Sequence, residues 1–279
     1  MPNARSAVKF LRGGNYGNSI CWTIDPALND PAFFRQLKQI GLRFVRCNFD
    51  ADRFLGEPLY QNVIDQFAQN VWAAGMYPII CPQEFPKASS DPLRLYKTTG
   101  LMRLMAERFK GQPVWYEIMN EPFLLQQWST WKPFAIKWVR AIRQIDPEAF
   151  VIVPFEGWCA DGRGAAQDPI REVRVDLYDG HAYINPSEVA VRFGSAIRAG
   201  LPVMIGEYGG DTATYLRQMN KAIQDLPGAL MAVAPWAFTI YGMDGLPLIE
   251  SFTSNGLKFT AAGKPVADDY ALWNMGQKR

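Results

Sequence analysis

Two segments of the sequence each carry an apolar run that ends in a glutamate. One segment reads WYEIMNEP over residues 115–122, and the other reads PVMIGEY over residues 202–208. Glu121 and Glu207 therefore both stand where a buried strand would end. Cleavage of a glycosidic bond needs two carboxyl groups, one that holds a proton and one that stays charged. The pair predicts acid/base and nucleophilic chemistry at a sugar carbon.

Other polar and aromatic residues also stand at the ends of apolar runs. Core packing alone does not explain such a concentration, because polar side chains are seldom buried without a partner or a role. We predict that they line one site together with the two glutamates. These residues are Asn15, Arg46, Asn48, Gln83, Asn120, His181, Tyr183 and Trp236.

Arg46 and His181 each have a structural interpretation beside the functional one. Arg46 lies inside an apolar run, where an ion pair with a core carboxylate would explain it, and Glu207 is a plausible partner in either case. His181 is the single histidine of the chain, and a lone histidine is often a structural residue. Its place at a strand end, close to Tyr183, favours the site.

Tryptophan residues supply candidate platforms for sugar rings, whose C–H faces stack on aromatic side chains. Trp236 follows the last apolar run, and we interpret it as the floor under one sugar ring rather than as a lid aromatic. Trp128, Trp131 and Trp158 lie in or after the fourth and fifth loops. Packing and sugar stacking explain these three equally well.

Several other chemistries are excluded by missing residues. One histidine cannot supply the ligand set of the metal-dependent barrel hydrolases. The chain has no G-x-S-x-G nucleophile turn, no G-x-G-x-x-G and no G-x-x-x-x-G-K-[ST]. We therefore expect no metal and no organic cofactor.

The elements that must position these residues recur along the chain as an apolar run, a turn and a helical stretch that ends at Gly or Asp-Pro. Eight such units of about 30 residues each predict a single (β/α)8 TIM barrel of the α/β class, which fills residues 1–279 without an accessory carbohydrate-binding module. Its active site would lie at the C-terminal ends of the strands. The expected strands are Val8–Leu11, Arg43–Cys47, Tyr77–Cys81, Val114–Met119, Phe150–Val153, Val175–Tyr183, Val203–Glu207 and Leu230–Trp236.

The expected helices follow these strands, and the segment 156–168 is too rich in Gly and Asp to predict one clearly. The predicted helices are Pro31–Ile40, Tyr60–Ala74, Pro92–Gly111, Lys132–Ile145, Asn185–Gly200, Thr214–Asp225 and Val266–Trp273.

The composition is that of an ordinary globular protein, with 48% apolar and 20% charged residues. The net charge is +2 and no long run of like charge occurs, so we expect neither nucleic acid nor a membrane as partner. No apolar stretch is long enough to span a bilayer, and the N-terminus lacks an apolar signal region. Four cysteines form no C-x-x-C pair, and we expect buried free thiols rather than a disulfide. We expect a monomer.

The motifs together resemble glycoside hydrolase family 5, in the clan of retaining barrel glycosidases. The resemblance rests on Asn120-Glu121-Pro122, Glu207 after Ile205-Gly206, Arg46, His181-Ala182-Tyr183 and Trp236. It implies that Glu121 is the acid/base and Glu207 the nucleophile, and that Arg46, Gln83, Asn120, His181, Tyr183 and Trp236 bind substrate. Gln83 is a departure, because the family has a histidine at that position.

The resemblance implies hydrolysis of internal β-1,4 bonds in a neutral oligo- or polysaccharide, and it implies secretion. We expect an endo-β-1,4-glucanase (a cellulase). A β-mannanase, another β-glycanase or a transglycosylase of the same family remain alternatives. A barrel that binds oligosaccharide without cleaving it is an alternative of another class, and Gln83 is the feature that supports it.

Overall fold

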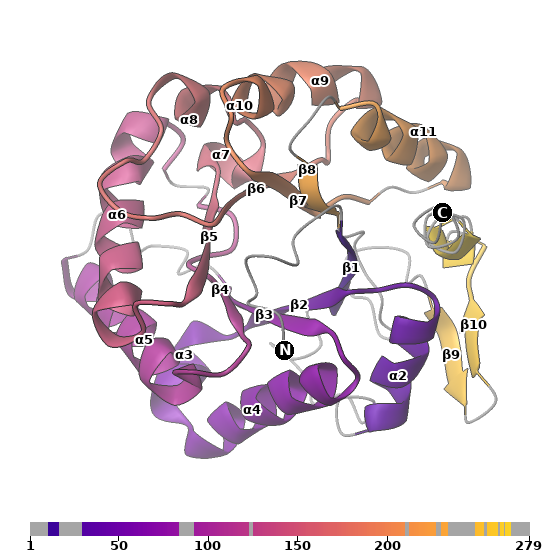
Figure 1. The fold of residues 1–279 in the computed structure, drawn as a ribbon, viewed down its shortest axis with the longest axis horizontal. Helices are drawn as coiled ribbons and strands as arrows, with labels where there is room; N and C mark the ends of the chain where they lie inside the picture. The colour runs from indigo at the N-terminus through magenta and orange to yellow at the C-terminus, as the bar shows by residue number, and fades with distance from the viewer. Residues whose placement is uncertain are drawn as a thin grey trace.

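Eight parallel strands close into a barrel in chain order, and helices surround it (Figure 1). The computed structural model describes residues 11–16, 30–83, 92–122, 125–209, 212–226, 230–233, 249–253, 256–261, 263–264 and 266–268. The strands are β1 (Leu11–Tyr16), β2 (Phe44–Phe49), β3 (Tyr77–Pro82), β4 (Trp115–Glu117), β5 (Phe150–Pro154), β6 (Leu177–His181), β7 (Val203–Glu207) and β8 (Leu230–Val233). Pairing of Leu11 with Ala232 joins β1 to β8 and closes the barrel. The predicted barrel is confirmed.

The helices form the outer ring of the barrel. They are α2 (Pro31–Gln39), α3 (Ala51–Gly56), α4 (Pro58–Ala73), α5 (Pro92–Phe109), α6 (Trp128–Ile145), α7 (Glu156–Cys159), α8 (Arg163–Gln167), η3 (Pro186–Glu188), α9 (Val189–Arg192), α10 (Gly194–Arg198) and α11 (Ala213–Gln224). Local sequence sets where they begin. For α2, the Asp30 carboxylate accepts a bond from the Ala32 N–H, and Pro31 occupies the first turn, where it needs no hydrogen-bond partner.

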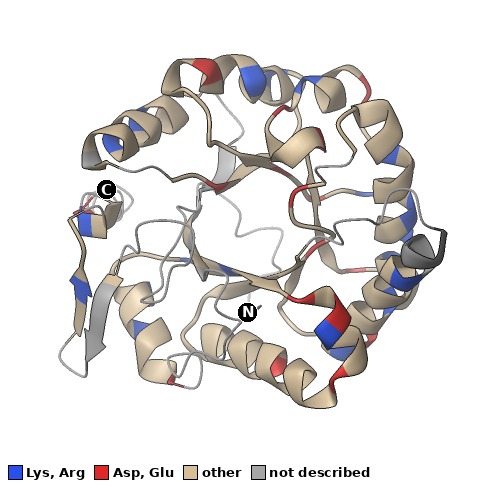
Figure 2. Cartoon of the chain, turned by 180° about the vertical axis from the view of Figure 1, so that it is seen from behind, with Lys and Arg blue, Asp and Glu red and all other residues tan. Residues whose placement is uncertain are grey.

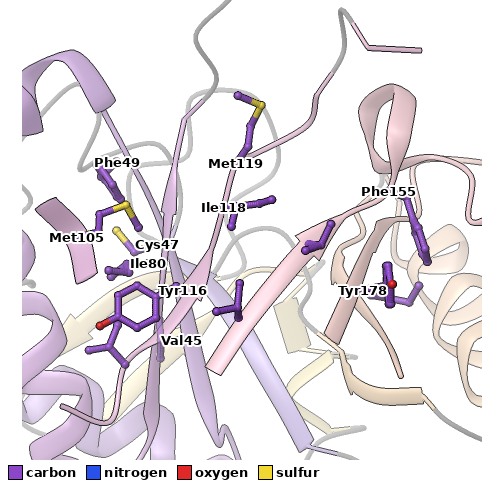
Figure 3. Close-up of a cluster of buried hydrophobic side chains, with 14 of the residues drawn as sticks. Val45, Cys47, Phe49, Ile80, Met105, Tyr116, Ile118, Met119, Phe155 and Tyr178 are labelled. Carbon is purple, nitrogen blue, oxygen red and sulfur yellow. The ribbon is translucent and has the colours of Figure 1, made fainter. Parts of the chain in front are cut away.

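Large side chains fill the space between the outer faces of the strands and the helices. Figure 3 shows part of this layer, in which Val45 and Cys47 on β2, Ile80 on β3 and Tyr116 on β4 pack near Met105 of α5. All five residues are fully buried. Burial of this layer against the helices is the main source of the barrel's stability.

The barrel interior changes from apolar to polar along the strands. Its lower layer is a separate cluster of Phe44, Ile79, Trp115, Phe150, Ile152, Leu177 and Met204. Side chains of a strand alternate between its two faces, so the next inward position lies two residues further on. Two residues beyond Phe44, Ile79, Trp115 and Leu177 stand Arg46, Cys81, Glu117 and Asp179, all of them fully buried. This second layer lies directly beneath the C-terminal ends of the strands. We call this end of the barrel its mouth.

Several elements differ from those expected from the sequence. β1 is Leu11–Tyr16 and includes Gly13 and Gly14, which were expected in a turn, while Val8, Lys9 and Phe10 of the expected strand lie outside the described residues. The segment 156–168 holds the two short helices α7 and α8. The antiparallel hairpin of β9 (Ile249–Thr253) and β10 (Gly256–Phe259) was not predicted, and it lies outside the barrel beside α2 (Figure 1).

Some expectations fall on residues that the structure does not describe. Trp236, Cys21 and most of the predicted last helix lie outside the described residues. Within the described part, Cys47, Cys81 and Cys159 are buried thiols that form no disulfide, as expected. No described helix is long and apolar enough to cross a membrane. Lys and Arg are scattered among Asp and Glu over the helices in Figure 2, in keeping with the small net charge.

Candidate active site

Glu121 and Glu207 meet at the barrel mouth. Glu207 is the last residue of β7, and Glu121 lies four residues beyond the end of β4. One carboxylate oxygen of each and a ring nitrogen of His181 lie within 4.8 Å of one another. The Glu121 side chain is 18% exposed and that of Glu207 only 6%, so the first has more access to solvent.

Glu207 is surrounded by hydrogen-bond donors. The Arg46 guanidinium donates from Nη1 to Oε1 over 2.6 Å, and the Tyr183 hydroxyl donates to Oε2 over 3.0 Å. Burial and the neighbouring Glu207 raise the pKa of the Tyr183 hydroxyl well above its usual value, so it remains a donor. Both contacts fix the position of the Glu207 carboxylate.

Arg46 organises the second layer of the barrel. It donates to Glu117 through Nε and Nη2 over 2.6 and 2.8 Å, and to Oδ1 of Asn120 over 2.8 Å. Burial lowers the pKa of the Arg46 guanidinium, but Cys81, Glu117 and Glu207 raise it by more, so it stays charged. Burial also raises the pKa of Glu117 to about 7, against the opposing effect of Arg46. A buried arginine with this many acceptors fixes geometry in a way that lysine could not.

The chain after β4 is held so that Glu121 points toward Glu207. The φ angle of Glu121 is +35°, a region that non-glycine residues rarely adopt. The preceding Asn120 is fixed at both ends, because its N–H donates to the carbonyl of Pro82 over 2.9 Å and its Oδ1 accepts from Arg46. The amide nitrogen of Asn120 is therefore the group that it can offer to a sugar.

His181 lies between three carboxylates. Its Nδ1 is 2.8 Å from Oε1 of Glu121 and 3.5 Å from Oε2 of Glu207, and its Nε2 is 3.2 Å from Oδ2 of Asp179. Burial lowers the pKa of the imidazole, but Glu207 and Asp179 raise it by more, and the net direction is well above the usual value. Burial raises the pKa of Cys159 to about 12, so this neighbour remains a thiol.

The aromatic candidates separate by exposure. Trp131 is buried and donates to the carbonyl of Pro154 over 2.7 Å, and Trp128 is buried and donates to that of Asp168 over 2.6 Å. These two therefore pack. Trp158 and Tyr183 are each 47% exposed, so their rings are accessible, although the Tyr183 hydroxyl itself is directed inward at Glu207.

Gln83 and Asn48 stand at the mouth, two residues beyond Cys81 and Arg46. The Oε1 of Gln83 is a buried oxygen for which no hydrogen-bond partner is found in the described structure. A buried acceptor without a donor is costly, and a bound hydroxyl group would satisfy it.

Comparison with known proteins agrees with this geometry. The sequence matches the family described as Cellulase (glycosyl hydrolase family 5) over residues 7–238. The chain belongs to glycosyl hydrolase family 5.

Curated relatives of this family 5 chain are endoglucanases. An endoglucanase of Clostridium saccharobutylicum is 30% identical over 185 residues, which are 62% of this chain and 40% of the relative. Endoglucanase Z of Dickeya dadantii is 32% identical over 108 residues, which are 38% of this chain and 25% of the relative. The match thus spans less than half the length of either relative.

Solved structures of family 5 enzymes share the fold. Cellulase Cel5C_n superposes with a TM-score of 0.78 at 22% identity, covering 94% of this chain and 86% of that chain. The catalytic domain of Thermobifida fusca endoglucanase Cel5A, determined with cellotetraose, superposes with a TM-score of 0.76 at 18% identity, covering 94% and 91%.

The carboxylates at the mouth of this family 5 chain already have Arg46 or His181 as a partner. Two sets of donor atoms come close enough for metal coordination within the described residues: Glu117, Asp179 and His181, and Glu121, His181 and Glu207. Arg46 already contacts Glu117 and Glu207, and His181 contacts the remaining carboxylates. We assign no metal ligand here.

Sequence reasoning missed three residues of this network: Glu117, Asp179 and Cys159. A signal for the first two was present. Each stands two residues after a barrel-lining residue and therefore points inward like Arg46. Cys159 had no such signal, because it reaches His181 from α7, where Gly157, Trp158 and Cys159 all have positive φ angles.

Proposed function

We propose that the protein is a retaining β-glycoside hydrolase in which Glu207 is the nucleophile and Glu121 the acid/base. One observation carries the proposal: the two carboxylates approach within 4.8 Å but have different partners. Retaining enzymes hold their carboxyl groups about 5–5.5 Å apart, whereas inverting enzymes leave room for a water at about 6.5–9.5 Å. The short approach supports retention.

The first step forms a covalent intermediate. Glu207 attacks the anomeric carbon, and Glu121 donates its proton to the leaving glycosidic oxygen. Arg46 and Tyr183 donate hydrogen bonds to Glu207 and aim its oxygens. The amide nitrogen of Asn120 is placed to bond the sugar 2-hydroxyl, a contact that strengthens as positive charge develops at the ring.

The second step releases the sugar. Glu121, now a carboxylate, takes a proton from water, and the resulting hydroxide attacks the anomeric carbon and frees Glu207. His181 keeps Glu121 in place through the 2.8 Å contact during both steps.

The substrate we propose is a β-1,4-glucan cut at internal bonds. The curated relatives are endoglucanases, and a small net charge suits a neutral polymer. The exposed rings of Trp158 and Tyr183 offer flat faces on which sugars stack. A β-mannan is the second candidate. The Gln83 oxygen at the mouth would accept a bond from a sugar hydroxyl of either polymer, so it does not distinguish the two.

A panel of polysaccharides tests both the activity and the substrate. Release of reducing ends should be faster from carboxymethyl cellulose than from mannan, and the newly formed reducing end should appear first as the β-anomer in proton NMR. Glu207→Gln and Glu121→Gln should each lower kcat/KM by more than about 10³-fold, because each removes a reacting group.

The controls for this panel are internal. Lys221→Gln changes an exposed residue of α11 and should leave turnover unchanged. Near-normal activity in either glutamine variant, or an α-anomer as first product, contradicts the mechanism. Binding of cello-oligosaccharides without any cleavage favours the non-catalytic barrel instead.

A further inference from the structure

Asp179 is a fully buried carboxylate that the mechanism above does not use. It lies on β6, two residues before His181, and its Oδ2 is 3.2 Å from Nε2 of that ring. Its Oδ1 accepts the N–H of Gly206 over 2.6 Å. A Cβ at Gly206 would lie 2.3 Å from both Asp179 oxygens, so β7 needs glycine where this carboxylate stands. The contact is therefore a built feature of two adjacent strands.

The contacts form a line from Asp179 through His181 to Glu121. A neutral imidazole donates from one nitrogen and accepts at the other. Asp179 accepts from Nε2–H, which leaves Nδ1 to face Glu121 at 2.8 Å. The opposite tautomer would place a lone pair against the Asp179 carboxylate in a buried site, which is unfavourable.

We propose that Asp179 is a positioning residue for the acid/base: it holds His181 with a proton on Nε2, so that Nδ1 and Glu121 share the proton that the leaving group receives. This inference rests on the proposed role of Glu121. Asp179 contacts no substrate and acts only through His181.

The charges around His181 support this assignment. Glu121 approaches from the segment after β4, Glu207 from β7 and Asp179 from β6, while the Cys159 thiol comes from α7 and the Tyr183 ring packs edge-on. Glu117 lies within 4.8 Å on β4, but Arg46 binds it. Among the described residues, the cationic partner found for Asp179 is His181 alone. The carboxylate thus favours a proton on this ring.

The proton that leaves in the first step is replaced in the second. Before bond cleavage, one proton lies between Oε1 of Glu121 and Nδ1 of His181. Transfer to the leaving oxygen leaves Glu121 ionised and His181 neutral, with Nε2–H still on Asp179. Attack of water on the intermediate returns a proton to the pair.

Asp179→Asn tests the role kinetically. Asparagine has one acceptor oxygen for two donors, Gly206 N–H and His181 Nε2–H, so its amide favours the wrong tautomer of His181. We expect kcat/KM on an unactivated cello-oligosaccharide to fall about 10²-fold or more, with KM nearly unchanged. On a dinitrophenyl cellobioside, whose leaving group needs no proton, kcat/KM should stay within about threefold of the parent value.

An equal loss on both substrates would overturn the proposal. It would show that Asp179 acts through Gly206 on the neighbouring nucleophile Glu207 rather than through His181 on the acid. Asp146→Asn is the matched control, since Asp146 is a buried aspartate at the end of α6, away from the mouth. This variant should behave as the parent on both substrates.

The single histidine allows a direct test that needs no substrate. With ¹⁵N-labelled histidine, the parent protein gives one imidazole, and its Nε2 should remain protonated from about pH 5 to about pH 9. In Asp179→Asn the ring should lose its second proton at lower pH than in the parent protein.

An unprotonated Nε2 in the parent protein would sink the proposal even if the variant does not fold. Identical titration of parent and variant would sink it too. Because the measurement uses resting protein, it stays decisive if no polysaccharide is hydrolysed, which separates failure of this inference from failure of the proposed function.

Discussion

Glu121 and Glu207 are residues of the same type, but their neighbours differ, and the proposed mechanism gives them different roles. Glu207 accepts bonds from Arg46 and Tyr183, which supply a full positive charge and a hydroxyl donor. Glu121 contacts His181, a group that can both give and take a proton. The motifs around both glutamates could be predicted from the sequence. The inward direction of Glu117 and Asp179 could also have been inferred from the alternation of side chains along their strands, but their partners could not, because local spacing does not show which side chains meet inside the barrel.

Removal of a single oxygen atom tests how much the Tyr183 hydroxyl contributes to catalysis. Tyr183→Phe removes the donor to Glu207 and leaves the ring. A hydrogen bond to a charged group contributes about 1.5–3 kcal/mol, so kcat/KM should fall about tenfold to about 10²-fold. Initial rates on a cello-oligosaccharide measure this loss of kcat/KM.

A second tyrosine provides the control for this change. Tyr215→Phe removes a hydroxyl that donates to the carbonyl of Ile184 over 2.7 Å, outside the carboxylate cluster. This variant should keep parent-level kcat/KM. If both variants lose the same activity, the Tyr183 hydroxyl has no special role at Glu207.

At the scale of elements, the spacing of apolar residues and the helix start and stop signals predicted the regular strands and helices, but not the irregular segments. The strands β2, β3, β5 and β7 lie where their apolar runs predicted. α7 and the left-handed turn inside it escaped prediction, because tertiary contacts impose positive φ on Trp158 and Cys159. Glu156 opens this element as a buried carboxyl whose Oε2 has no hydrogen-bond partner in the described structure.

Glu156 should make stability depend on pH. Burial raises its pKa from the usual 4.5 to about 7. The folded protein thus holds a proton that the unfolded chain loses first, so this contribution to stability is complete below about pH 4.5 and is lost as pH rises to about 7. Glu156→Gln stays neutral and should be more stable than the parent above pH 7, by up to about 3 kcal/mol.

Urea unfolding of parent and variant across this pH range measures the difference. The two curves should coincide near pH 4.5 and separate toward pH 8. Curves that remain parallel across the range would show that Glu156 ionises in the fold without cost.

At the scale of the whole molecule, the proposed catalytic residues depend on the layered barrel interior. Apolar side chains fill the lower layer, Arg46 and the buried carboxylates fill the second, and Glu121 and Glu207 lie above them. The sequence predicted the eight-fold repeat and the end that carries the site, since both follow from βα units and their fixed polarity. The sequence could not predict how β1 fits into this interior. Two residues of β1 are glycines, and the lack of space for a side chain at Gly13 is visible only in the folded structure.

Gly13 on β1 should prove essential to barrel closure. A Cβ at this position would lie 2.2 Å from the Phe44 ring, which belongs to the buried lower layer and cannot move without disturbing Trp115, on which it stacks. Gly13→Ala should therefore destabilise the protein by about 1–3 kcal/mol, the usual effect of overpacking.

Gly100→Ala makes the same chemical change on α5, where nothing lies within 4 Å, and should stabilise by up to about 1 kcal/mol through helix propensity. Opposite shifts of the two melting temperatures are expected, and Gly13→Ala should lower activity only in parallel with the folded fraction. A Gly13→Ala protein as stable as the parent would mean that β1 does not pack against Phe44 as described, and the contact of Asn15 with Arg46, two residues further along the same strand, would lose its support.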